Sequence, residues 1–185
     1  MLDFWKQRRQ RRLLAQLSQG TRNKRIANLS DIRQVGIVFS VGDKESWDTL
    51  YHFAKELEQG GRTVWMLGAQ AADMSIDYVF THPRMTIVHE KTDLDFFGVP
   101  KPELTAAFLS PRYDLLIDAT QEPNFLAKYV SAQAHADLKV THVDGNAMDG
   151  NEKERIFDFL IRSAQPMGVA AYLQETMKYL SMIRK

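Results

Sequence analysis

The chain has no cysteine among its 185 residues, which excludes disulfide bonds, a thiolate nucleophile and metal sites built on cysteine. No apolar run approaches the roughly 20 residues that a membrane-spanning helix needs. Hydrophobic residues make up 44% and charged residues 25% of the chain, as in an ordinary globular domain. We therefore expect a cytoplasmic α/β protein, with membrane association limited to its periphery.

The common catalytic and nucleotide-binding motifs are also missing. No Gly-x-Gly-x-x-Gly turn follows the first apolar run, and there is no P-loop, no Gly-x-Ser-x-Gly elbow and no His-Glu-x-x-His pair. The aromatic residues do not form a base-stacking motif of the RNA-recognition type. We predict neither a cofactor nor a metal, and the sequence leaves open whether the protein is an enzyme.

Basic residues are concentrated at the N-terminus. The net charge is +1, but residues 1–25 hold eight basic residues against Asp3 alone, and residues 26–185 hold sixteen basic and twenty-two acidic residues. Such asymmetry favours contact with RNA, with an anionic membrane or with the protein's own acidic surface. The basic residues of this N-terminal arm are Lys6, Arg8, Arg9, Arg11, Arg12, Arg22, Lys24 and Arg25.

The arm is expected to be helical, but it lacks the apolar core of a signal peptide. On a helical projection its leucines fall on one side, which Lys6 and Arg9 interrupt, so the apolar stripe is weak for a membrane-surface helix. We predict a solvated helix that docks on the body through Leu13, Leu14 and Leu17. The alternative is an arm that binds RNA or an anionic surface, with Phe4 and Trp5 inserting locally.

The pattern of the body is one of alternating strands and helices. Gln34–Ser40 is a buried strand, Asp43 is suited to cap a helix that runs to about Gln59, Gly60-Gly61 ends that helix, and Thr63–Leu67 is a second strand. Further strands are predicted at Tyr78–Phe80, Met85–His89, Tyr113–Asp118, Leu138–Val143 and Arg155–Ile161, and helices at Pro102–Leu109, Pro123–Ala136 and Val169–Ile183.

This order predicts an open, mostly parallel, doubly wound Rossmann-like sheet of about five to six strands with flanking helices. Residues 1–25 form the arm, and residues 26–185 form one domain. The loop around Phe96 and Phe97 is expected to cover a small satellite core, whereas Trp5 has no obvious core to join.

Ligands of such sheets bind outside the carboxyl ends of the strands. The candidate residues there are Ser40, Gly42, Asp43, Asp118, Thr120, His142 and Asp144. The aspartates and His142 are suited to hold a divalent ion or to supply a general base. The competing interpretation is structural: Asp43 caps a helix, Asp118 accepts from loop amides and Asp144 belongs to a turn.

The sequence also resembles two known families. The basic arm, the strand Val35–Phe39, the segment Asp95–Gly98 and the strand Tyr113–Asp118 together resemble an uncharacterised bacterial family of domains of unknown function, which implies no activity. The pair Gly42-Asp43 and the segment from Tyr113 to Val140 resemble the N-terminal half of GT-B glycosyltransferases of the heptosyltransferase type. That second likeness implies a lone or degenerate acceptor half, because the chain has no room for a second domain.

Three functions follow from these observations. The first is a non-catalytic Rossmann-like binding or protein-interaction module with a basic arm, including self-association. The second is a small enzyme, or a sugar- or nucleotide-binding protein, that uses the carboxylates at the strand ends. The third is a protein that associates with RNA or a membrane surface through residues 1–25.

Overall fold

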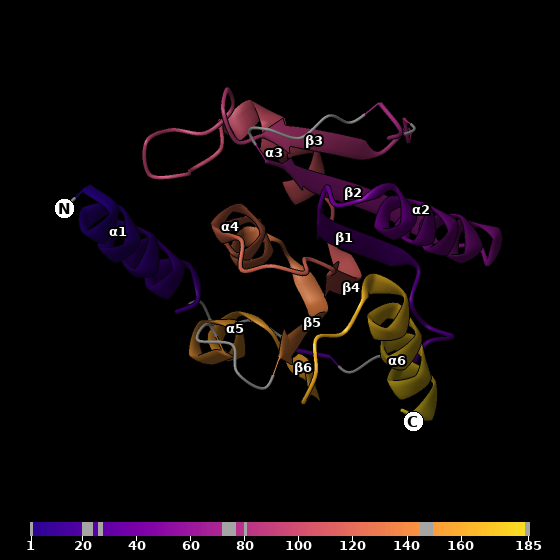
Figure 1. Ribbon diagram of the computed structural model, residues 1–185. Coiled ribbons are helices and arrows are strands. Elements are labelled where there is room, and N and C mark those ends of the chain that lie inside the picture. Colours follow the sequence, from indigo (N-terminus) through magenta and orange to yellow (C-terminus); the bar gives the residue numbers. More distant parts are fainter. Residues whose placement is uncertain are drawn as a thin grey trace.

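The β-branched, apolar runs of the body form six parallel strands, in the order β3-β2-β1-β4-β5-β6 (Figure 1). The computed structural model describes residues 2–19, 24–25, 28–71, 77–79, 81–144 and 150–183. The strands are β1 (Gln34–Ser40), β2 (Thr63–Gln70), β3 (Met85–His89), β4 (Tyr113–Asp118), β5 (Ala136–Asp144) and β6 (Phe159–Ser163). The helices are α1 (Leu2–Leu17), α2 (Lys44–Gln59), α3 (Pro102–Leu109), α4 (Phe125–Gln133), α5 (Gly150–Ile156) and α6 (Val169–Met182).

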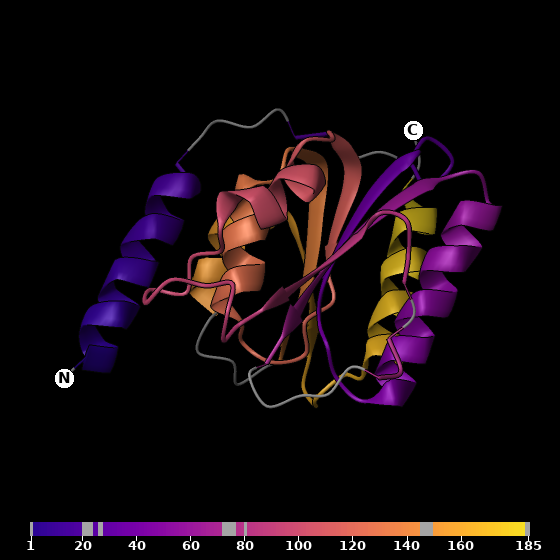
Figure 2. The same cartoon turned by 90° about the horizontal axis from the view of Figure 1, so that it is seen from above.

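Helices cover both faces of the sheet. Figure 2 shows α2 and α6 on one face and α3, α4 and α5 on the other, with α1 lying outside this second layer. Ile37 and Ile117 face α2 and α6, whereas Val38 and Leu116 pack with α3 and α4. Because the central strands are buried on both faces, their apolar runs are nearly continuous, as expected for a parallel sheet.

The side of the sheet to which successive strands are added changes between β1 and β4, which are parallel neighbours. Val35 of β1 pairs with Val64 on one side and with Leu115 on the other. The strands that follow β1 first extend the sheet one way, through β2 and β3, and the strands from β4 onward extend it the other way. This switch point is where doubly wound sheets bind their ligands, so it positions the predicted site. Within the described residues, no helix is both long and apolar enough to cross a bilayer.

The structure corrects three expectations about the elements. Tyr78 lies in a turn and Val79 has no regular structure, so the strand expected there is absent from these two residues, and Phe80 lies outside the described residues. The strand expected at Arg155–Ile161 begins later, as β6, because Arg155 and Ile156 end a helix. That helix, α5, was not predicted, since its polar sequence (GNEKERI) has too few apolar residues to show a period.

Element boundaries differ by a few residues elsewhere. The helix expected at Pro123–Ala136 is shorter, because Asn124 caps its start and Ala136 already pairs in β5. Phe125 and Tyr129 of this helix are only half-buried and pack towards the cluster that contains Leu14 of α1. The helix therefore uses one side for the main core and another for the arm.

Candidate functional site

The carboxyl edge of the sheet contains the residues that the sequence singles out. Asp43 lies directly before α2 and caps it: its Oδ1 accepts from the backbone N–H of Ser46 over 2.8 Å, and its Oδ2 accepts from the Ser46 hydroxyl over 3.1 Å. The hydrogen bond from the Ser46 backbone lowers the pKa of Asp43 below its ordinary value. The structural interpretation of this residue is thus confirmed, and its carboxylate is committed to the helix end.

Asp118 is fully buried and accepts hydrogen bonds from the polar groups around it. Its Oδ1 accepts from the backbone N–H of Thr120 over 3.1 Å and from the Thr120 hydroxyl over 2.7 Å. Its Oδ2 accepts from the hydroxyl of Thr141 on the next strand over 3.2 Å. The predicted role of Asp118 as an acceptor of loop amides is confirmed, and the same contacts explain why Thr120 is buried beside it.

His142 faces the other side of the sheet. Thr141 and His142 are consecutive in β5, so their side chains point to opposite faces. Thr141 meets Asp118, whereas the His142 ring lies 5.1 Å from the ring of Tyr172 in α6. Tyr172 is fully buried, and this burial together with the charge of Asp118 raises the pKa of its hydroxyl well above its ordinary value. The sheet separates His142 from the hydrogen bonds of Asp118.

The space at this edge is small. Ser40 and Gly42 line a cavity of about 10 Å³ together with Ser46 and Trp47 of α2. Such a volume admits about one water molecule and no organic ligand. Asp144 ends β5 through its backbone pairing with Ser163, and its side chain lies outside the described part of the structure. Among the described residues, no group of three or more histidine or acidic side chains is placed to hold a metal ion.

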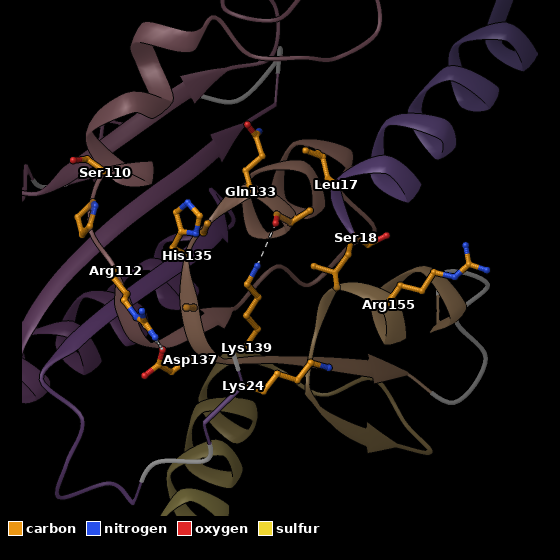
Figure 3. Close-up of a pocket in the computed structure, with 15 residues that line it drawn as sticks. Leu17, Ser18, Lys24, Ser110, Arg112, Gln133, His135, Asp137, Lys139 and Arg155 are labelled. Carbon is orange, nitrogen blue, oxygen red and sulfur yellow. Dashed lines mark hydrogen bonds and ion pairs between the residues drawn. The ribbon is translucent and has the colours of Figure 1, made fainter. Parts of the chain in front are cut away.

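A much larger pocket lies at the opposite edge of the sheet. It has a volume of about 730 Å³ and is bounded by the ends of α1, α3 and α4 and by the starts of β4 and β5 (Figure 3). Its lining includes the basic side chains of Lys24, Arg112, Lys139 and Arg155. No sequence pattern indicates this pocket, because ligand sites of parallel sheets are expected at the carboxyl ends of the strands.

Most of these cations are bound by the protein itself. Arg112 donates to Asp137 over 2.6 Å, and Lys139 donates to the backbone carbonyl of Ala132 in the last turn of α4 over 3.3 Å, as the dashed lines of Figure 3 show. Lys139 also donates to the backbone carbonyl of Ser131. Lys24 pairs with Asp158 over 3.1 Å. Helix C-termini carry partial negative charge, and basic side chains offset it. The pocket is therefore better described as a seam between arm and body than as a site for a free anion.

The arm docks on the body along one side of α1. Leu14 is only 4% exposed and packs with Ile156 and Phe157, while Leu13 and Leu17 are half-buried. These contacts confirm the predicted docking for Leu14. Further along the helix, the side-chain amide of Gln10 donates to the backbone carbonyl of Phe97 over 2.7 Å.

The opposite side of α1 is exposed and basic. Lys6 is half-buried on the flank towards the body, and Arg9 lies 4.8 Å from the centre of the Phe97 ring. We define the outward face of α1 as Phe4, Trp5, Arg8, Arg11 and Arg12, all of them exposed.

The remaining basic residues of the arm belong to the connection. Lys24 is tied to Asp158, and the backbone N–H of Arg25 donates to the carbonyl of Asp137 over 3.1 Å. Arg22 lies outside the described residues. The segment at Lys24 and Arg25, which connects α1 to the body, is therefore bound at the amino edge of the sheet. Part of the arm's positive charge is paired there with an acidic residue of the body, Asp158.

Exposed aromatic residues mark this end of the molecule. Phe4 is 63% and Trp5 57% exposed, in agreement with the lack of a core for Trp5. Phe96 is 58% exposed, so the expectation that it packs beneath its loop is wrong. The loop instead turns Phe97 towards Arg9, and the two neighbouring rings meet edge to face, 5.2 Å apart.

Comparisons with known proteins agree with the first resemblance. The comparison with curated proteins found no significant match. A family model described as a family of unknown function, DUF6913, matches residues 3–183. The match thus spans both the arm and the α/β body. On this evidence the chain belongs to the DUF6913 family.

Proposed function

We propose that this protein is a binding module in which the Rossmann-like body holds the basic helix α1 and presents its outward face to an anionic partner. The observation that carries the proposal is the division of α1 into two sides. Leu14 is buried on the body, whereas Arg8, Arg11 and Arg12 are turned to solvent. A solvated helix that needed only solubility would not require such a concentration of one sign of charge.

Two further observations support this role. The family match begins at residue 3, so the family model covers the arm as well as the body. The arm is also braced at two separate places, by Leu14 against α5 and by Gln10 against the loop that holds Phe97. Holding the helix in place before binding lowers the entropy that the complex must lose.

The carboxyl edge favours the module over a small enzyme or a sugar- or nucleotide-binding protein. Asp43 is used as a helix cap, Asp118 is buried among threonine donors, and the adjoining cavity has room for about one water. The likeness to the acceptor half of GT-B glycosyltransferases stays a prediction that no comparison tests. Self-association and a protein partner likewise stay open as uses of the module.

The proposal is tested by the retention of the full chain on immobilised heparin, used here as a general polyanion. We expect the double variant Arg8→Gln/Arg12→Gln to elute at clearly lower salt than the wild type. With two fewer cationic contacts, its binding to heparin releases fewer counterions. The matched control is Lys55→Gln/Lys178→Gln, which removes the same charge from α2 and α6, where both lysines pair with glutamates. Equal elution of the two double variants would overturn the proposal.

A further inference from the structure

Three exposed aromatic side chains belong to α1 and to the loop that contacts it through Phe97, and we call Phe4, Trp5 and Phe96 the aromatic corner. Phe4 and Trp5 belong to the first two turns of α1, and Phe96 is at the tip of the loop between β3 and α3. Both Figure 1 and Figure 2 show this loop extending towards α1. The other large hydrophobic side chains exposed in the described residues, Tyr179 and Met182, lie on α6 on the opposite face of the sheet.

The loop that carries Phe96 is held in a defined shape. The Oδ1 atom of Asp95 accepts from the backbone N–H groups of Phe97 and Val99, over 2.8 and 2.9 Å. Gly98 has a φ of +82°, which lets the chain turn back, and Leu94 then bridges to Pro100. A hydrogen-bonded turn therefore holds Phe96 in its exposed position, and the exposure does not come from loose packing of the loop.

Cations surround the aromatic corner. Arg8, Arg11 and Arg12 continue the outward face of α1 beyond Phe4, and Arg9 lies against Phe97 on the flank towards the loop. Aromatic rings placed among arginines are suited to the interface of a bilayer, where rings enter between headgroups and the cations meet lipid phosphates. Asp95, the acidic residue of the loop tip, directs its carboxylate into the turn.

We infer that the partner of the outward face is an anionic lipid bilayer, into which Phe4, Trp5 and Phe96 insert shallowly. This inference rests on the proposed function and names its partner. The leucine side of α1 stays on the body in this arrangement, since Leu14 is buried there. Attachment is therefore reversible and depends on both the few inserted rings and the charge of the lipid.

The same features favour a bilayer over RNA. Sheet-based RNA modules stack bases on rings laid across an open sheet, and here helices cover both faces of the sheet (Figure 2). The rings of Phe4 and Trp5 stand at 80° to each other, and those of Phe96 and Phe97 at 84°. Such edge-to-face pairs form no common platform for successive bases, whereas insertion among lipids requires no particular ring orientation.

The test is co-sedimentation of the full chain with vesicles of phosphatidylglycerol mixed with phosphatidylcholine, compared with vesicles of phosphatidylcholine alone. We expect binding to the mixed vesicles only, lost at high salt, together with a blue shift of Trp5 fluorescence. Trp47 is buried, and Trp65 is half-buried in β2 with Arg84 over its ring, so neither is placed to contribute much to that shift. Phe96→Ser should weaken vesicle binding about tenfold, because one buried phenylalanine is lost from the complex.

Met182→Ser is the matched control, since Met182 is 60% exposed on α6, away from the aromatic corner. It should bind the mixed vesicles like the wild type, and an equal loss in both variants would overturn the inference. Retention on heparin without vesicle binding would also overturn it and leave the proposed function standing, and binding of a labelled single-stranded RNA would then identify the partner as RNA. Failure to bind heparin, vesicles and RNA alike would overturn both proposals.

Discussion

The side-chain amide of Gln10 donates a hydrogen bond to the backbone carbonyl of Phe97, joining residues 87 positions apart in the sequence. This bond fastens the basic helix α1 to the loop that presents Phe96. We expect Gln10→Ala to raise the rate of hydrogen exchange in α1 about fivefold, as one lost hydrogen bond implies. Gln7→Ala, at an exposed position of the same helix, should leave the exchange rates unchanged, and equal effects would contradict the docking role.

Leu14 anchors the same helix at its other end. It packs with Ile156 and Phe157, so Leu14→Ala should weaken the docking of α1 by about 2 kcal/mol through the lost apolar contact and the cavity left behind. The measurement is limited trypsin digestion, since the arm offers several arginines. Cleavage within α1 should accelerate while the body stays intact, and an unchanged cleavage rate would show that Leu14 does not hold the helix.

Alanine variants of Gly98 and Gly61 distinguish the effect of backbone strain from the effect of a clash with the arm. Both have positive φ, +82° and +79°, a region that costs a residue with a side chain about 1–2 kcal/mol. A Cβ at Gly98 would lie 3.1 Å from Nε2 of Gln10 and 3.2 Å from the Phe125 ring, whereas a Cβ at Gly61 meets nothing within 4 Å. Both alanine variants should lower the free energy of unfolding, but Gly98→Ala alone should also expose α1 to trypsin.

Asp43 should make the stability of the protein depend on pH. Its pKa is lowered in the folded state, so its cap stabilises the protein above the ordinary carboxyl range and is lost as the pH falls through the folded pKa. Asp43→Ala should lower the free energy of unfolding by about 1 kcal/mol at neutral pH. In thermal melts from pH 7 down to about pH 3, this difference should shrink. Asp43→Asn, which still accepts from Ser46, should show no such pH dependence.

We expect Asp118 to stabilise the fold mainly because its oxygens accept hydrogen bonds, and less because of its charge. Asp118→Ala leaves the Thr120 amide and the Thr141 hydroxyl without their acceptor, at a cost of about 1–3 kcal/mol for each buried group. Asp118→Asn keeps an oxygen for Thr120, and the Thr141 hydroxyl can rotate to accept from the new amide. Denaturant unfolding should therefore rank the asparagine variant well above the alanine variant, and the reverse order would exclude this account.

Local sequence patterns predicted most of the α/β framework, because they depend on neighbours in the chain. The apolar run Gln34–Ser40, the Asp43 cap and the helix to Gln59 are confirmed as expected. The left-handed turn expected after that helix is made by Gly61. The strand expected at Tyr78–Phe80 is absent from Tyr78 and Val79, because a run of only three residues carries too weak a signal to exclude a turn.

The candidate site was predicted less well. The sequence predicted Asp118 and His142 at the same edge, and they do lie near the carboxyl ends of the neighbouring strands β4 and β5. Their side chains lie on opposite faces, however, because Thr141 takes the position that faces Asp118. The pocket at the amino edge escaped prediction, since its walls come from the ends of helices far apart in the sequence.

The sequence by itself determined the alternation of strands and helices, the caps and turns between them, and the concentration of basic charge before residue 26, because each depends on residues adjacent in the chain. Only the tertiary structure decided where α1 lies on the body, that Phe96 is turned outward, and that Asp118 is closed off from solvent. Those outcomes depend on contacts such as Gln10 with Phe97, which form only when distant segments pack against one sheet.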